Sequence, residues 1–269
     1  MKRLLLALQF LTIIPVRTGG NPSEKELAES AIFFPVAGAL QGLLLLLAAL
    51  LLARVFPLDI VSGFVIVTAV ISNGGFHLDG LADTFDALAV KSSGDAAADR
   101  EKRLAVMKDS FTGSIGVTAV VLTILLEFVL IRNLLSYPVP LTAFLLLFMM
   151  PVFSKWTMVP AMYHGMPARN SGLGKIFIDG SDLHCLLFSS ALAFVLFGGL
   201  LGAQLWLNYG LRGMTFFLIL PAGYLFAYGC AVYCNKTFGG LTGDTLGAIG
   251  ELSGIFYLTG AYIWLQHCI

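Results

Sequence analysis

The sequence predicts an all-α protein, a polytopic transmembrane helical bundle of about seven spans preceded by a short N-terminal helix. Only 12% of its 269 residues are charged and 58% are hydrophobic, whereas a soluble domain has about 25% charged residues. The hydrophobic residues are gathered in long blocks, and the positive charges fall mainly in alternate connections between those blocks. Length, composition and charge pattern therefore indicate one integral membrane domain over residues 1–269.

Seven hydrophobic blocks have, or nearly have, the roughly 20 apolar residues that a bilayer crossing needs. They are residues 31–53, 60–72, 115–131, 141–159, 186–207, 214–233 and 246–265. The second block reaches this length only if it extends to about Phe76. Six and eight spans are therefore alternatives to seven.

The N-terminal residues 1–16 form a basic pair, Lys2 and Arg3, followed by a short apolar run that ends at Pro15. This outline is that of a signal peptide, but no small-residue cleavage site follows. We expect an interfacial or re-entrant helix instead.

The positive charges predict the orientation in the cell (inner) membrane, because Lys and Arg are enriched in cytoplasmic connections. With the N-terminus inside, only Arg54, Arg132 and Arg212 lie in outer connections. The inner connections hold Lys2, Arg3, Arg17, Lys25, Lys91, Arg100, Lys102, Arg103, Lys108, Arg169, Lys175 and Lys236. The polar connections then share the cytoplasmic face, where we expect the active site.

A net charge of zero gives no indication of nucleic-acid binding, and the apolar faces leave a homo-oligomer possible.

The most informative motif is an acidic stripe. Asp79, Asp83 and Asp86 are spaced i, i+4 and i+7, which places them on one side of a helix. Three such carboxylates repel one another unless a cation lies between them, and Mg²⁺ shares its ligand shell with substrate phosphates. The alternative is a solvated first helical turn. His77, beside the stripe, is either a packed core histidine or a general base or phosphate contact.

Three further connections carry polar residues suited to phosphates. Lys108 and Asp109 precede two glycines, Gly113 and Gly116, which close helix packing explains equally well. A glycine-rich loop holds the two cations Arg169 and Lys175, which suit diphosphate oxygens. Asp244, in the last connection, is either a helix N-cap or another metal or substrate contact.

Three charged residues fall inside hydrophobic blocks. Lys155 precedes Trp156, as in a lysine that extends its ammonium to the interface beside an interfacial tryptophan. Glu251 requires a partner, because an unpaired acid in a span costs on the order of 3 kcal/mol. We interpret Glu127 as structural and expect it nearer the outer side.

The motifs together resemble the cobalamin synthase family, the adenosylcobinamide-GDP ribazoletransferases. The resemblance rests on residues 74–86 (GGFHLDGLADTFD), 107–110 (MKDS) with Gly113 and Gly116, and 240–248 (GLTGDTLGA) with Glu251. Residues 8–12 (LQFLT) and 14–16 (IPV) also resemble the opening of the family. The motifs occur in the expected order over essentially the whole chain.

The resemblance implies a membrane enzyme that joins α-ribazole, or its 5′-phosphate, to adenosylcobinamide-GDP, releases GMP and requires Mg²⁺. As hypotheses, we assign metal binding to Asp79, Asp83, Asp86 and Asp109, and direct participation in the reaction to Asp83, His77 and Lys108. The expected substrate contacts are Arg169, Lys175, Ser110, Thr242 and Asp244.

Three other classes remain as alternatives. Residues 79–82 (DGLA) resemble part of the CDP-alcohol phosphotransferase signature, but its following Arg and its downstream G-x-x-x-D-x-x-x-D are absent. A membrane prenyltransferase would carry two Asp-rich motifs, and both are not present here. An ion-coupled transporter suits intramembrane acids, yet these acids lie at helix ends and the chain shows no inverted repeat.

Overall fold

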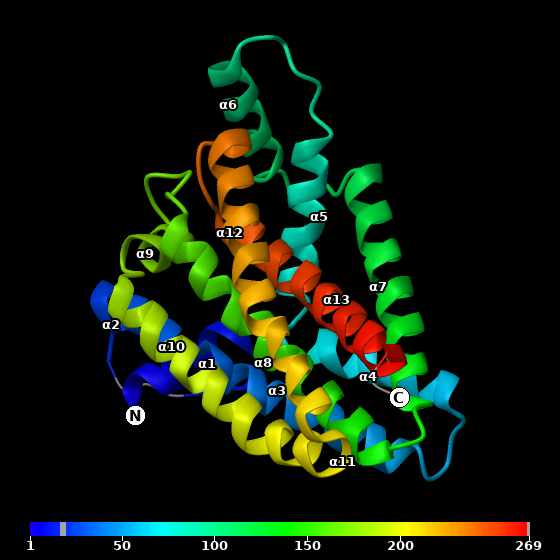
Figure 1. Cartoon of the computed structure of the whole chain (residues 1–269). Coiled ribbons are helices and arrows are strands. Elements are labelled where there is room, and N and C mark those ends of the chain that lie inside the picture. The colour runs from blue at the N-terminus through cyan, green and yellow to red at the C-terminus, as the bar shows by residue number, and fades with distance from the viewer. Residues whose placement is uncertain (17–19, 268–269) are drawn as a thin grey trace.

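The computed structural model describes residues 1–16 and 20–267 (Figure 1). The regular secondary structure of this part of the chain is α-helical, apart from short 3-10 and π-helical turns and one isolated β-bridge. The all-α prediction is confirmed. Arg17, which was counted in the charge pattern, lies outside the described residues. The helices are α1 (Lys2–Leu11), α2 (Glu24–Glu29), α3 (Phe34–Leu52), α4 (Leu58–Ser72), α5 (Phe76–Leu88), α6 (Ala96–Val106), α7 (Ser114–Leu135), α8 (Pro140–His164), α9 (Leu173–Asp179), α10 (Leu183–Leu196), α11 (Ala203–Met214), α12 (Ile219–Phe238) and α13 (Gly243–His267).

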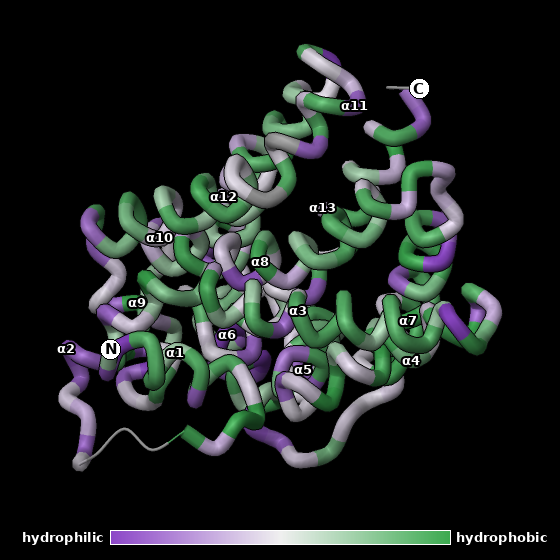
Figure 2. The backbone as a smooth tube through the Cα atoms, turned by 90° about the horizontal axis from the view of Figure 1, so that it is seen from below, coloured by the Kyte–Doolittle hydropathy of each residue, from purple (hydrophilic) through white to green (hydrophobic). Residues whose placement is uncertain are grey.

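The number of membrane crossings agrees with a polytopic bundle. In the described part of the chain, five helical segments are long and apolar enough to cross a bilayer, or up to seven if each of two bent helix pairs counts as one span. Figure 2 shows hydrophobic residues along most of the helices, with hydrophilic residues concentrated in connections and at helix ends. This distribution is the one that a hydrocarbon surrounding selects.

Helix α8 is the centre of the bundle. It packs against α3, α10, α12 and α13, and most of its residues are buried although the helix is 25 residues long. Helix α3 approaches it closely at Gly38 and Gly42, where a Cβ on Gly38 would lie 2.8 Å from the Cα of Val152. Glycines four apart allow such backbone contact between membrane helices, because packing rather than hydrophobicity drives their association.

The second predicted span is bent rather than straight. Helix α4 ends at Ser72, and α5 begins at Phe76 at an angle of 88° to it. Gly74 and Gly75 form the bend with φ angles of 67° and 74°, values that side-chain-bearing residues rarely adopt. The bend is what turns the acidic motif of α5 away from the direction of α4.

The fifth hydrophobic block, residues 186–207, is not one helix. Helix α10 ends at Leu196, a π-helical turn covers Phe197–Gly202, and α11 follows. Several glycines occupy this turn, and glycine costs about 1 kcal/mol relative to alanine inside a helix. Hydrophobicity alone predicted one span here; the structure keeps part of the block, Leu183–Gly199, as a segment of a possible span and adds a π-helical turn that was not expected.

The predicted N-terminal helix is present as α1. Ion pairs hold it against the start of the long α2–α3 segment, with Lys2 Nζ 2.8 Å from Glu26 Oε2 and Arg3 paired with Glu29. On its other side, the ring of Phe10 packs on Phe177 of α9, with ring centroids 4.4 Å apart. These contacts tie α1 to the end of the molecule where α9 lies.

The polar connections gather at one end of the bundle. Helix α7 is about 33 Å long at 1.5 Å per residue and runs from this end of the bundle to the opposite one. Its last turn pairs Arg132 with Asp59 at 2.9 Å, whereas its first turn contacts α5. At the end where α7 begins, Arg103 Nη1 of α6 donates to the carbonyl oxygen of Thr237 at 3.0 Å, which adds a cation at the C-terminus of α12.

Helices α5 and α7 are joined by a carboxylate. The two oxygens of Asp86 accept hydrogen bonds from the backbone N–H groups of Gly113 (2.6 Å) and Gly116 (2.8 Å) at the start of α7. They therefore satisfy amides that have no partner within the helix. A Cβ on either glycine would collide with this carboxylate, and one on Gly116 would also lie 2.7 Å from the carbonyl oxygen of Ala82.

We therefore expect Gly116→Ala to destabilise the protein. The added methyl group has no space, and overpacking of this kind costs about 1–3 kcal/mol. The matched control is Gly63→Ala on α4, where a Cβ would meet nothing within 4 Å. In detergent, thermal unfolding should show a lower Tm for Gly116→Ala and an unchanged or higher Tm for Gly63→Ala. Equal Tm values for the two variants would contradict the steric account of this joint.

Candidate functional site

A cavity of about 530 Å³ opens among α1, the start of α5, α9 and the start of α13. Six of the residues singled out from the sequence line it: His77, Asp79, Arg169, Lys175, Thr242 and Asp244. They come from three regions that are far apart in the chain. The structure thus assembles one site from the acidic motif, the glycine-rich loop and the last connection.

Close packing of α5 on α13 brings the first and last of these regions together. A Cβ on Gly80 would lie 2.7 Å from the carbonyl oxygen of Asp244, and a Cβ on Gly247 would lie 3.2 Å from the Cα of His77. Neither position has space for a larger residue without a shift of backbone. The two helices therefore meet at glycines, and the acids of α5 lie beside Asp244.

Backbone hydrogen bonds fix the glycine-rich loop to the last connection. The N–H of Ala168 donates to the carbonyl of Leu241 at 2.9 Å, and the N–H of Leu241 donates to the carbonyl of Met166 at 2.6 Å. Gly240, next to this isolated bridge, has a φ of 153° and would place a Cβ 2.6 Å from the nitrogen of Ala168. This bridge carries Arg169 to within 3.2 Å of Asp244, measured from Nη2 to Oδ2.

The guanidinium of Arg169 retains unused hydrogen-bond donors. Its Nε and Nη2 atoms are buried and have no hydrogen-bond partner among the described residues, although Nη2 is ion-paired with Asp244. Buried donors without partners are rare in native structures, and a planar guanidinium matches phosphate oxygens. Lys175 also lines the cavity and is paired with Asp179. The cavity therefore presents cationic groups suited to an oxyanion.

The acids form a group of like charges beside those cations. Asp79 is exposed on the cavity wall, and Asp83 is half-buried one turn further along α5. Asp83 interacts electrostatically with Asp79, Asp86 and Asp244, and with Arg169 as countercharge. An anionic substrate would add to this repulsion unless a cation entered with it.

Thr242 and Asp244 have distinct positions at the start of α13. The hydroxyl of Thr242 accepts a hydrogen bond from the N–H of Thr245 at 3.1 Å and donates to Asp244 Oδ2 at 3.2 Å. Thr242 is therefore the N-cap of α13, so the alternative in which Asp244 is the cap was wrong. The cap leaves Asp244 free to pair with Arg169.

The remaining predicted site residues, Asp83, Asp86, Lys108, Asp109 and Ser110, do not line the cavity. Asp86 has both carboxylate oxygens engaged by α7. Lys108, Asp109 and Ser110 lie exposed in the connection before α7, where Asp109 Oδ1 accepts from the N–H of Phe111 at 3.2 Å. Their predicted metal and substrate roles stay predictions, and they would require this connection to approach the cavity.

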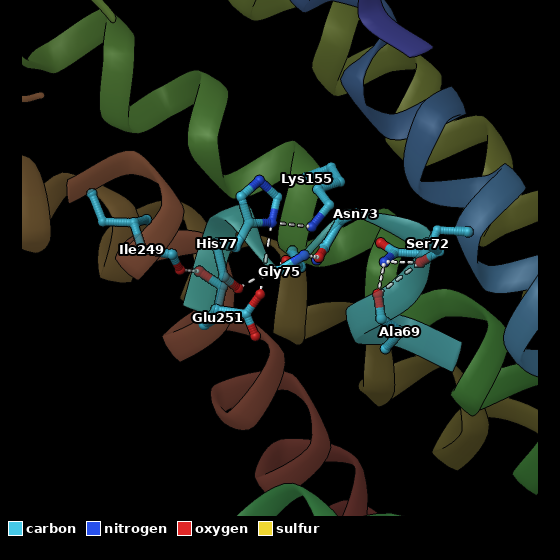
Figure 3. A network of polar contacts seen from close by, with 12 residues as sticks. Ala69, Ser72, Asn73, Gly75, His77, Lys155, Ile249 and Glu251 are labelled. Atoms are coloured by element: carbon cyan, nitrogen blue, oxygen red, sulfur yellow. Dashed lines mark hydrogen bonds and ion pairs between the residues drawn. The ribbon is translucent and has the colours of Figure 1, made fainter. Parts of the chain in front are cut away.

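Behind the cavity lies a buried polar group that the sequence reasoning only partly anticipated (Figure 3). Lys155 of α8 is 3% exposed, and its Nζ lies 2.8 Å from Nδ1 of His77. Glu251 Oε1 lies 3.7 Å from the same nitrogen, and Glu127 interacts electrostatically with both Lys155 and Glu251. The expected snorkelling of Lys155 was therefore wrong, and Glu127, expected to be structural, belongs to the same buried group. An available signal was that three charges lay in separate hydrophobic blocks with no other partner.

No ready-made metal centre is present. Within residues 1–16 and 20–267, no group of three or more His, Cys, Asp or Glu side chains has the geometry to hold a metal ion. This arrangement still fits Mg²⁺, which is usually bound by one or two carboxylates together with substrate phosphates and water. On the acidic stripe, Asp79 and Asp83 accept no hydrogen bond from a described backbone N–H group, in contrast to Asp86.

Comparison with known proteins gives a consistent result. The family model described as cobalamin-5-phosphate synthase matches residues 3–262. A protein of Thermodesulfovibrio yellowstonii named adenosylcobinamide-GDP ribazoletransferase is 34% identical and covers 99% of this chain and 100% of its own length. Relatives of the same name from Fusobacterium nucleatum and Desulfitobacterium hafniense are each 33% identical, over 96% and 97% of both chains respectively.

No solved structure matches this chain. The family model and the relatives nevertheless cover nearly the whole chain. The chain belongs to the cobalamin-5-phosphate synthase family, a family of transferases that act on phosphorus-containing groups.

Proposed function

We propose that this protein joins α-ribazole, or its 5′-phosphate, to adenosylcobinamide-GDP and releases GMP, at the cytoplasmic face of the inner membrane. The observation that carries the proposal is the cavity in which the cations Arg169 and Lys175 line the same walls as Asp79 of α5 and Asp244 of α13. Such a site suits a diphosphate accompanied by a cation. The names of the relatives supply the substrate class.

The donor set at the cavity fits Mg²⁺. Asp79 and Asp83 would hold the ion, with Asp244 as a neighbouring carboxylate, since they are hard oxygen ligands with excess negative charge. When bound, Mg²⁺ would supply neutralisation of the diphosphate oxygens and of the departing phosphate. The predicted ligand roles of Asp86 and Asp109 would require a rearrangement at α7.

The residues of the chain then have separate tasks. Arg169 and Lys175 hold oxygens of the diphosphate and align it in the cavity. A ribose hydroxyl of α-ribazole attacks the phosphorus that bears the cobinamide arm, the bond from that phosphorus to the GMP oxygen breaks, and GMP leaves. A carboxylate of the acidic group accepts the hydroxyl proton. The surrounding apolar bundle limits access of water and hence competing hydrolysis.

The direct test is turnover by the purified protein in liposomes. We expect GMP release that requires both Mg²⁺ and α-ribazole, together with formation of the joined corrinoid nucleotide. Release that is independent of α-ribazole would contradict the proposal. Uptake of a solute without turnover would instead support the transporter alternative.

In the same assay, Asp83→Asn should lower kcat by at least about 100-fold, the usual scale for removing one group that stabilises the transition state. The matched control is Asp59→Asn, an exposed carboxylate at the other end of the bundle. Both variants should insert normally into the membrane. Near-normal turnover by Asp83→Asn would remove the assignment of this residue to the metal.

The proposed contact between Arg169 and the diphosphate of the substrate can be tested independently of the metal. We expect Arg169→Gln to lower kcat/KM for the GDP-bearing substrate by about 10- to 100-fold, because hydrogen bonds to charged groups contribute about 1.5–3 kcal/mol each. Arg169→Lys should recover only part of this loss, since lysine lacks the planar fork. Arg54→Gln, in an exposed connection at the other end, should behave as wild type. A wild-type kcat/KM for Arg169→Gln would contradict the assigned contact.

A further inference from the structure

The buried group behind the cavity contains a lysine that the proposed reaction does not use. Lys155 lies near the middle of α8, is almost fully buried, and has its ammonium nitrogen 2.8 Å from Nδ1 of His77. Gln41, Asn73 and Ser154 surround a cavity of about 30 Å³ beside it, together with the glutamates described above. This volume is enough for about one water molecule. A polar group of this kind inside a membrane bundle requires a functional or structural reason.

The charges around Lys155 favour its ammonium form. Two carboxyl groups, those of Glu127 and Glu251, line the same small cavity as Lys155, and an ammonium is the form of lysine that provides them with a countercharge in a medium of low dielectric. An ammonium has three hydrogen-bond donors and no acceptor. Its short contact with Nδ1 of His77 therefore requires that nitrogen to be the acceptor.

This requirement sets the tautomer of His77. A neutral imidazole carries one proton, and when Nδ1 accepts a hydrogen bond the proton is on Nε2. His77 lines the main cavity and lies two residues before Asp79. We infer that Lys155 is a positioning residue that holds His77 as the Nε2–H tautomer, so that His77 donates a hydrogen bond to a phosphate oxygen of the substrate and is not the base of the reaction.

This inference rests on the proposed function for the identity of the acceptor, but not for the tautomer itself. The competing arrangement has a neutral Lys155 amine that accepts from Nδ1–H, which would leave Nε2 with a free lone pair and suited to a base. The two arrangements have the same heavy-atom positions. They differ in which ring nitrogen carries hydrogen, and that difference is measurable without any substrate.

The first experiment measures the tautomer by ¹⁵N NMR of the full-length protein in lipid nanodiscs, labelled at histidine. The chain has four histidines, and the His77 signals are identified by their loss in His77→Gln. We expect hydrogen on Nε2 and none on Nδ1 in the wild type, and loss of that preference in Lys155→Met. Lys91→Met, at an exposed lysine in the α5–α6 connection, is the matched control and should leave the signals unchanged. Hydrogen on Nδ1 in the wild type, or an unchanged tautomer in Lys155→Met, would overturn the inference.

The second experiment keeps the inference testable if Lys155→Met does not fold. Glutamine has an N–H donor but is no base, so His77→Gln should retain turnover within about 10-fold of wild type, whereas His77→Leu should lose at least a further 10-fold, the scale of one hydrogen bond to a charged group. Equal losses in the two variants would contradict the donor role. Absence of ribazole transfer in the wild type would defeat the proposed function, while the NMR result would still decide the tautomer.

Discussion

The close contact of α5 with α13 and α7 is the constraint on which the rest of the site depends. Gly80 and Gly247 remove side chains where α5 meets α13, and Gly116 does the same where α5 meets α7. Because backbones approach so closely, acids from separate regions of the chain share one volume. Figure 1 shows α5, α7 and α13 as neighbours, and each of the three contacts the other two. A larger residue at any of these glycines would push the helices apart and so move the acids away from one another, although no acidic residue is itself replaced.

The same contact divides the acidic stripe into two kinds of carboxylate. Asp86 is satisfied by backbone amides and joins two helices. Asp79 lines the cavity, and Asp83, one turn further along α5, interacts electrostatically with Asp79 and Asp244. Like charges without hydrogen-bond partners are costly in a folded protein. In our account, the substrate and its accompanying cation relieve that cost. Without substrate and cation, the binding site therefore contains carboxylates whose mutual repulsion is only partly offset by Arg169.

The sequence was sufficient for the fold class and for the family, and six of the residues singled out from it line one cavity. The stripe at Asp79 and Asp83 follows from helical spacing alone, and residues 74–86 carried the family resemblance. The sequence could not provide the contacts between residues that are far apart in the chain. The engagement of Asp86 depends on where α7 begins, and the burial of Lys155 depends on its contact with His77. The π-helical turn between α10 and α11 was not expected, because hydrophobicity does not report the helix-weakening effect of glycines.

The measurement that tests the central claim most directly uses Mn²⁺ in place of Mg²⁺ and observes the phosphorus signals of bound GDP by ³¹P NMR. A paramagnetic ion held by Asp79 and Asp83 should broaden both phosphorus signals in the wild-type protein in nanodiscs. The broadening should be lost when both residues are changed to Asn, while Asp59→Asn retains it. Equal broadening in the double variant would mean that the ion and the diphosphate meet elsewhere, and the site assembled on α5 would have to be abandoned.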